Sequence, residues 1–234
     1  MRIAVTRSEP DASHTSERLR ALGAEAVLAP LLVIETRAFD ATLDGVQALL
    51  FTSANGVRAF AERSAAREIV ALTVGDATAE AARACGFREA HSADGDVATL
   101  AAFVQHLCDP KRGRLVHIAG ADVAGDLVGA LTSAGFDAER RVAYEAVAVT
   151  QAPAVLLGDI DLVLFHSARA ARVYAALGAP RAAERAAACL SPAVAEAVQN
   201  SPDRSIPWAR IIVSPTPREE ALLRAALAST DASA

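Results

Sequence analysis

Small and hydroxyl-bearing residues recur in this chain at one kind of place, where a short apolar segment gives way to an amphipathic one. At such a point a strand ends and a helix begins. Backbone N–H groups and the positive end of the helix dipole are available there, and both favour an anion. We therefore take these residues as candidate binding groups: Arg7, Thr52, Ser53, Asn55, Gly75, Thr78, Gly120, Ser167, Ser191 and Thr216.

In an open parallel sheet these junctions share one edge, formed by the carboxyl ends of the strands, where ligands bind. A ligand that contacts several of them is large and carries several negative groups. Each residue also has a structural explanation. Ser, Thr and Asn are ordinary helix N-caps, worth about 1 kcal/mol each, and Gly75 and Gly120 can serve as turn glycines. Arg7 is harder to explain in this way, because a cap does not need a guanidinium.

Tyr144 is the candidate for chemistry. It is one of only two tyrosines and lies in an extended segment that reads Arg-Val-Ala-Tyr-Glu. An aromatic residue in such a segment usually packs, but a phenol can also donate a hydrogen bond to a leaving oxygen. His166, beside the Ser167 junction, has a possible role as well, although a histidine at a strand end is more often structural.

The sequence lacks the usual cofactor and nucleophile motifs. No Gly-x-Gly-x-x-Gly follows a strand, and neither the phosphate-binding loop nor the Gly-x-Ser-x-Gly elbow occurs. The five histidines and three cysteines show no metal-ligand spacing. We expect neither a metal nor a cofactor.

Charge and hydropathy limit the classes of partner that the protein can bind. The net charge of −5 argues against a nucleic-acid partner, which needs a basic face. No apolar run reaches the roughly 18–20 residues of a membrane span, and the first residues enter a strand-like segment without a signal-peptide pattern. We expect a cytoplasmic monomer that binds a small molecule and neither nucleic acid nor membrane.

A twelve-residue segment occurs twice in similar form. Residues 49–60 and 163–174 share the pattern Leu-Phe-x-Ser-Ala, so that Phe51 matches Phe165 and Ser53 matches Ser167, each pair 114 positions apart. Two weaker matches follow, with Gly75 aligned to Ser191 and Gly23 aligned to Gly135, at offsets of 116 and 112. A period of this length is that of a domain rather than of a solenoid repeat. The chain therefore reads as a duplicated module.

Short apolar runs alternate with amphipathic segments, the pattern of a parallel sheet with helices on both faces. We expect strands or extended segments at Arg2–Thr6, Ala24–Ala29, Gln47–Phe51, Val70–Val74, Leu115–Ala119, Arg141–Thr150, Leu162–His166, Ala187–Leu190 and Arg210–Val213. We expect helices at Asp11–Leu22, Ala54–Arg63, Val97–Leu107, Asp122–Ser133, Ala193–Gln199 and Arg218–Ala228, with another between Gly75 and Gly86.

Taken in order along the chain, several short motifs resemble those of the uroporphyrinogen-III synthase family. The matching residues are Thr6-Arg7, Pro30, Phe51 to Val57, Val74 to Ala79, Gly86-Phe87, Val142 to Glu145, Phe165-His166-Ser167 and Ser214 to Pro217. The resemblance spans essentially the whole chain. Each motif is weak alone, and their order and spacing carry the comparison.

The resemblance implies two flavodoxin-like parallel-sheet domains joined by a two-stranded linker, with a cleft between them. The expected domains are residues 1–34 plus 147–234, and an inserted domain of residues 35–146. It further implies a cofactor-free lyase that closes hydroxymethylbilane, a linear tetrapyrrole with eight carboxylates, into uroporphyrinogen III. The enzyme expels the hydroxyl group as water and inverts ring D through a spiro intermediate. Tyr144 matches the tyrosine proposed to assist departure of the hydroxyl group.

The C-terminal copy departs from the family pattern. Ser191 and Val194 stand where the family usually carries Gly and Thr, and His166 stands where Thr is common. These departures place the better-defined half of the site in the central domain. Two alternatives remain open: a non-enzymatic two-domain module that binds a polycarboxylate without using Tyr144, and a two-domain glycosyl- or nucleotide-transferase, which the missing nucleotide motif disfavours.

Overall fold

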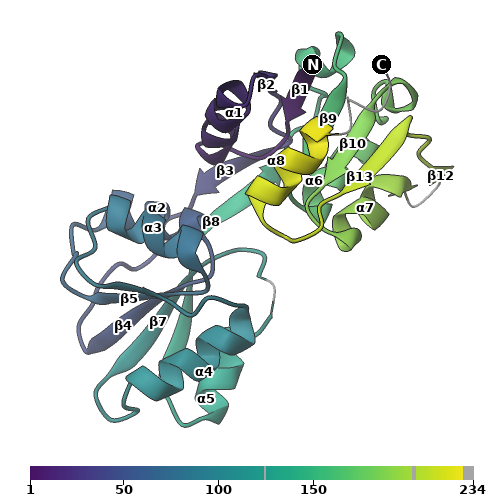
Figure 1. Ribbon diagram of the computed structural model, residues 1–234. Coiled ribbons are helices and arrows are strands. Elements are labelled where there is room, and N and C mark those ends of the chain that lie inside the picture. The colour runs from purple at the N-terminus through teal and green to yellow at the C-terminus, as the bar shows by residue number, and fades with distance from the viewer. Residues whose placement is uncertain (124, 202–203, 229–234) are drawn as a thin grey trace. The chain divides into compact units, whose positions relative to one another are not determined.

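The computed structural model describes residues 1–123, 125–201 and 204–228. The chain divides into two compact units (Figure 1). Unit 1 comprises Met1–Val33 and Val147–Ala234, and unit 2 comprises Ile34–Ala146, which is inserted into unit 1. The two points where the chain passes between units fall in β3 (Leu32–Thr36) and β8 (Ala138–Ala148), which are neighbours in one sheet. These two strands form the expected two-stranded linker.

Unit 1 is built on a five-stranded sheet with the order β13-β10-β9-β1-β2, in which every neighbouring pair is parallel. This is the flavodoxin-like strand order. Its strands are β1 (Arg2–Val5), β2 (Glu25–Leu28), β9 (Leu162–Phe165), β10 (Ala186–Cys189) and β13 (Arg210–Val213). Its helices are α1 (Asp11–Ala21), α6 (Ala168–Ala176), α7 (Pro192–Gln199) and α8 (Glu219–Ala228). Short elements complete the unit: η1 (Ala154–Leu157), η2 (Ala182–Glu184), β11 (Asn200–Ser201) and β12 (Arg204–Ser205).

Unit 2 holds a six-stranded sheet with the order β3-β8-β7-β4-β5-β6. Its own strands from β4 to β8 pair in parallel. They are β4 (Val46–Phe51), β5 (Val70–Thr73), β6 (Ala90–Ser92), β7 (Arg114–Gly120) and β8. The helices are α2 (Ala54–Arg63), α3 (Asp76–Ala84), α4 (Val97–Leu107) and α5 (Leu127–Ser133).

The two sheets are copies of one another. Read across the sheet, β2-β1-β9-β10-β13 in unit 1 corresponds to β8-β7-β4-β5-β6 in unit 2. The register repeats as well: Leu50 pairs with Leu72, and the matching Leu164 pairs with Ala188. The offsets of 114 and 116 found in the sequence are therefore offsets between equivalent strands. Along the chain, β1 and β2 come first, then β4 to β6, then β7 and β8, and finally β9, β10 and β13. The first and last of these segments form the sheet of unit 1, and the two middle segments form the sheet of unit 2, an arrangement that we call interleaved.

Helices cover both faces of each sheet. In unit 1, α6 and α7 pack on one face around Phe165, while α1 and α8 pack on the other around Leu164. In unit 2, α2 and α3 cover the face that carries Phe51, and α4 and α5 cover the face that carries Leu50. Adjacent residues of one strand thus feed opposite cores, as the period of two requires. Within the described part of the chain, no helix combines the length and the apolarity needed to cross a membrane.

The expected helix Asp122–Ser133 begins five residues late. It starts at Leu127, after Asp126, whose carboxylate accepts a hydrogen bond from the Gly129 N–H at 2.8 Å. Gly125, just before it, has a φ of +107°, a conformation that glycine adopts readily and that cannot continue a helix. The segment that follows β7 is consequently a loop, and this loop contributes to the cavity described next.

Candidate functional site

A cavity of about 470 Å³ opens at the carboxyl edge of the unit 2 sheet. From β4 the chain continues to β5 on one side of that strand, whereas β7 pairs with β4 on the other side. The order in which the chain adds strands to the sheet therefore reverses between β4 and β7. Such a switch point is where open α/β sheets bind ligands. The lining comes from the segments that follow β4, β5 and β7, from the start of α4 and from β8: Thr52, Ser53, Val74, Asp96, Val97, Ala98, Asp122, Val123 and Tyr144.

Tyr144 reaches this cavity because of a local irregularity in β8. Ala119 pairs with Val142, but Gly120 pairs with Tyr144, so Ala143 is an extra residue opposite the end of β7. Bulges of this kind re-aim side chains. The tyrosine ring lies against Gly120: a Cβ on that glycine would be 2.9 Å from the ring carbons Cε2 and Cζ. Gly120 therefore leaves room for the ring and supports the site indirectly.

Thr52 contacts a buried histidine. The Oγ1 of Thr52 lies 3.0 Å from Nε2 of His117, on the neighbouring strand β7. His117 is 2% exposed. Burial lowers its pKa to about 4, and the positive charge of Arg140 acts in the same direction. The imidazole is therefore neutral at pH 7, and it makes its polar contact with a hydroxyl group that lines the cavity.

The charged groups of the cavity lining are carboxylates. Asp96 is the N-cap of α4 and accepts hydrogen bonds from Thr99 N and Oγ1 at 2.9 and 3.0 Å, which lower its pKa. Asp122 lies in the loop after β7. None of the described residues that line this cavity is lysine or arginine. The cavity therefore favours hydrogen-bond donors and positive charge in whatever binds it.

Of the other predicted residues of unit 2, Ser53 lines this cavity, and the rest are at the starts of helices α2 and α3. Ser53 lines the cavity and also caps α2, because its Oγ accepts a hydrogen bond from Asn55 N at 3.2 Å. The amide oxygen of Asn55 accepts from Arg58 at 3.0 Å. Gly75 is the N-cap of α3 and directly follows the lining residue Val74, whereas Thr78 is buried in the first turn of that helix.

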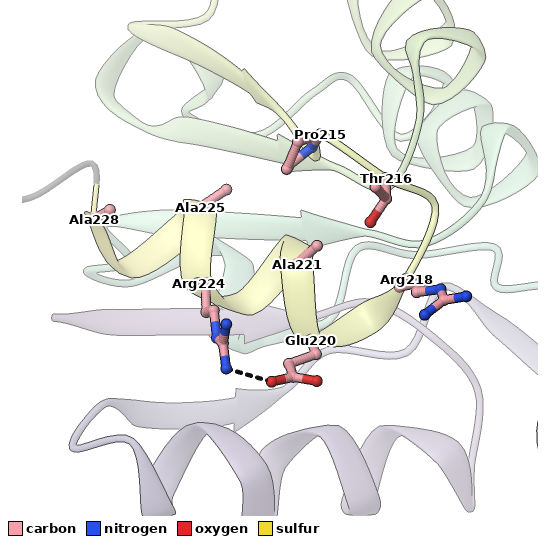
Figure 2. A pocket seen from close by; sticks show the side chains of 8 residues that line it. All are labelled: Pro215, Thr216, Arg218, Glu220, Ala221, Arg224, Ala225 and Ala228. Atoms are coloured by element: carbon pink, nitrogen blue, oxygen red, sulfur yellow. Dashed lines mark hydrogen bonds and ion pairs between the residues drawn. The ribbon is translucent and has the colours of Figure 1, made fainter.

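The predicted residues of unit 1 are more dispersed. Ser167 and Ser191 cap α6 and α7, accepting hydrogen bonds from Ala170 N and Val194 N at 3.2 and 3.4 Å. Thr216 lines a separate pocket of about 440 Å³ along α8. Figure 2 shows Ala221 and Ala225 projecting from α8 toward Pro215 and Thr216, while Glu220 and Arg224 form an ion pair on another side of the helix.

Arg7 belongs to an ion-pair network at the switch point of unit 1. Its guanidinium lies 3.0 Å from Asp11 and 2.9 Å from Glu219. Glu219 also accepts hydrogen bonds from Thr15 and Arg18, and His166 Nε2 lies 3.3 Å from it. Burial would raise the pKa of Glu219, but the contacts with His166, Thr15 and Arg7 outweigh it and hold that pKa far below its usual range. The predicted binding group Arg7 is thus already paired with two carboxylates.

Sequence reasoning missed His117, Asp96 and Glu219. Asp96 could have been found, since an Asp just before an apolar periodic segment is a helix N-cap signal. His117 offered a weaker signal, a single polar residue within a buried strand. Glu219 is 212 positions from Arg7, and no local pattern announces their contact. In the part of the chain that the structure describes, no cluster of three His, Cys, Asp or Glu could hold a metal ion.

Comparison with known proteins identifies the family to which the chain belongs. A family model described as uroporphyrinogen-III synthase HemD matches residues 13–224. The chain belongs to the uroporphyrinogen-III synthase family. The match covers nearly all of both units, including every residue of the cavity described above. No sequence among the curated proteins matches this chain significantly.

Solved structures from the uroporphyrinogen-III synthase family share the fold. The uroporphyrinogen-III synthetase of Helicobacter pylori superposes with a TM-score of 0.69 at 17% identity, covering 98% of this chain and 100% of its own. A mutant uroporphyrinogen III synthase from Thermus thermophilus gives a TM-score of 0.57 at 17% identity, with 99% of each chain covered. At these identities the comparison supports the two-domain α/β fold, and the predicted fold class is confirmed.

Proposed function

We propose that this protein is a uroporphyrinogen-III synthase, a cofactor-free lyase of tetrapyrrole and heme biosynthesis. It converts hydroxymethylbilane into uroporphyrinogen III with loss of water and inversion of ring D. The observation that carries the proposal is the family match over residues 13–224. The cavity at the switch point of unit 2, which contains Tyr144, is compatible with it. The family match favours this enzyme over the non-enzymatic polycarboxylate module, which would have no use for the phenol.

The reaction does not require a strong acid or a strong base from the protein. An electron-rich pyrrole expels the neighbouring hydroxyl group, and a carbocation stabilised by the pyrrole nitrogen forms. The protein must assist that departure, hold ring D next to the cation and keep water away. We assign the first task to Tyr144, whose phenol O–H donates a hydrogen bond to the leaving oxygen. The second and third tasks fall to the shape of the enclosing site.

The charges of the cavity in unit 2 suggest which part of the substrate enters it. Two carboxylates, Asp96 and Asp122, repel a substrate carboxylate but attract a pyrrole N–H or the cation that forms as the hydroxyl group leaves. We therefore place a pyrrole ring in this cavity and the acetate and propionate groups outside it. Helix N-termini at Gly75, Ser167 and Ser191 are the proposed partners of those acidic groups, together with Thr78, Asn55 and Thr216. Arg7 is less suited to this role, because it is already paired with Asp11 and Glu219.

The deciding experiment is an isomer assay. Purified protein is supplied with freshly made hydroxymethylbilane, and the type III and type I uroporphyrins are quantified after oxidation. Spontaneous closure gives type I, so we expect type III to dominate and its share to rise with protein concentration. A product mixture no richer in type III than the protein-free control would refute the enzyme and favour the binding module.

We further propose that the protein acts as a monomer in the cytoplasm. One chain of the family fold contains both units and both sets of junctions, and the substrate is a small molecule that needs no second chain to reach them. Light scattering coupled to gel filtration tests the first part, with the mass of one 24.2 kDa chain as the expected result.

A further inference from the structure

The buried histidine of β7 is not needed by the fold. His117 pairs with Leu50 at the centre of the unit 2 sheet. In the duplicated sheet of unit 1, the equivalent pair is Val5 with Leu164, and Val5 is fully buried in an apolar cluster. The same place in the same fold thus accepts an aliphatic side chain. An imidazole with almost no exposure is costly there unless a partner compensates for the lost hydration.

The partner that compensates is at the candidate site. Nε2 of His117 lies 3.0 Å from the hydroxyl group of Thr52, and Thr52 lines the cavity that also holds Tyr144. A threonine hydroxyl can rotate about its C–O bond, so without a fixed partner its hydrogen and lone pairs point in several directions. A hydrogen bond to a buried ring on a rigid central strand removes that freedom.

We propose that His117 is a positioning residue, which holds the Thr52 hydroxyl group in one orientation toward the cavity. His117 itself does not line the cavity, so it acts on the substrate only through Thr52. The inference rests on the proposed function, because the substrate group that Thr52 would contact is a pyrrole ring of the bilane. In that setting the fixed hydroxyl group orients the ring relative to the phenol of Tyr144.

The electrostatic state of the ring suits this role. With a pKa of about 4, the imidazole is neutral at and around pH 7, so the contact with Thr52 does not switch as pH changes there. A neutral ring also offers one nitrogen that donates and one that accepts. With the proton on Nδ1, Nε2 accepts the hydrogen of the Thr52 hydroxyl group and leaves the lone pairs of that oxygen for the cavity, and the proposal requires this tautomer.

Variants at position 117 that can or cannot contact Thr52 distinguish a positioning role of His117 from a role in packing. His117→Val installs the residue found at the equivalent place in unit 1. His117→Gln carries an amide about as far from the backbone as Nε2, whereas His117→Asn is one bond shorter and cannot reach Thr52. Thr52→Val removes the hydroxyl group, and Thr52→Ser retains it. Each protein is assayed for kcat, KM and the type III to type I ratio, and for its unfolding midpoint in urea.

We expect His117→Val and Thr52→Val each to lower kcat about tenfold, the effect of losing one orienting hydrogen bond of ~1.4 kcal/mol, with KM little changed. Their combination should be no slower than either alone, because both remove the same contact. Thr52→Ser should be faster than Thr52→Val, and His117→Gln should be faster than His117→Asn, which should resemble His117→Val.

Independent, additive losses in the double variant would overturn the proposal, and so would a His117→Val enzyme that turns over normally beside a slow Thr52→Val. Should the valine variant fail to fold, the Gln and Asn variants decide: equal rates in the two contradict positioning. A wild-type protein that makes no type III product refutes the proposed function instead, which distinguishes the two failures.

Discussion

At the scale of single residues, the candidate site depends on where the chain places a phenol. Tyr144 reaches the cavity of unit 2 through the bulge at Ala143 and rests against Gly120. What the structure provides for this side chain is its position and its orientation. Orientation effects of this kind contribute several kcal/mol to a barrier when the reacting atoms are already in contact.

Tyr144→Phe tests the phenol directly. The ring that packs against Gly120 is retained, so we expect the unfolding free energy to change by less than about 1 kcal/mol. The hydrogen bond to the leaving hydroxyl group is lost, and kcat should fall about 10- to 100-fold, as expected for one hydrogen bond to a group that develops charge. Stopped assays of type III product provide the measurement. Unchanged turnover would remove Tyr144 from the mechanism.

Gly75 offers a second test, because the fold does not require glycine there. Its φ of −158° suits any residue, and a Cβ would meet nothing within 4 Å. The equivalent residue in unit 1 is Ser191, which caps α7. Gly75→Ser should therefore stabilise unit 2 by roughly 0.5 kcal/mol through a new cap and a stiffer unfolded chain. If the substrate approaches this backbone closely, KM should nevertheless rise.

The matched change is Ser191→Gly, which should lose a few tenths of a kcal/mol as a cap is removed. Comparing KM and urea midpoints for the two variants separates a binding role from a folding role. A Gly75→Ser enzyme with the wild-type KM would exclude close contact between the substrate and this junction.

At the scale of elements, the helix N-termini have two roles that the sequence alone cannot separate. Ser53 and Ser167 are equivalent caps, each accepting a backbone hydrogen bond at 3.2 Å, yet Ser53 also lines the cavity of unit 2. Ser53→Ala and Ser167→Ala should each cost about 1 kcal/mol of stability. Ser53→Ala should in addition lower kcat/KM several-fold, and by more than Ser167→Ala, because Ser53 lines the cavity. Equal losses of activity in the two variants would contradict a special role for the central unit.

Strand β7 carries a pH dependence of stability. The pKa of His117 is about 4 in the folded protein and about 6.5 when unfolded, so the unfolded chain binds a proton first as pH falls. The contribution of His117 to the free energy of unfolding is therefore fully present above pH 6.5 and is lost as pH falls toward 4. Between pH 8 and pH 5 the loss is about 2 kcal/mol.

Urea unfolding of the wild type and of His117→Val at pH 8 and pH 5 measures this contribution. The variant should lose about 2 kcal/mol less than the wild type over the same interval. His166, whose pKa burial also lowers, acts in the same direction in both proteins and cancels in the comparison. Glu219, with its depressed pKa, loses its contribution only below pH 4.5, outside the interval. Parallel pH curves for the two proteins would contradict this account.

Much of the secondary structure could be predicted from the sequence, because apolar periodicity and cap residues are local signals. Helices Ala54–Arg63 and Val97–Leu107 were expected with their observed bounds. The late start of α5 was missed, since Gly125 acts through its backbone conformation. The site residues Thr52, Ser53 and Tyr144 were expected and line one cavity. The contact of Thr52 with His117 was not expected, because 65 positions separate them and only the strand order brings them together.

At the scale of the whole molecule, the duplication is interleaved. The segment with β1 and β2 completes a sheet with β9, β10 and β13, while the segment with β4 to β6 completes one with β7 and β8. Each sheet therefore needs strands from two segments that a simple halving of the chain would separate. Unit 2 nevertheless is contiguous in sequence and has its own apolar clusters on both sheet faces.

This arrangement predicts which fragments fold. A fragment of residues 34–146 contains β4 to β7, β8 as far as Ala146 and both cores of unit 2, so we expect it to unfold cooperatively as an independent domain. A fragment of residues 1–113 has the same length but contains β1 and β2 without β9, and β4 without β7. Its unpaired strand edges and half-built cores should leave it unfolded or aggregated. Circular dichroism and urea titration of the two fragments provide the comparison. Cooperative folding of residues 1–113, or an unfolded 34–146, would show that the interleaved sheets are not the units of stability.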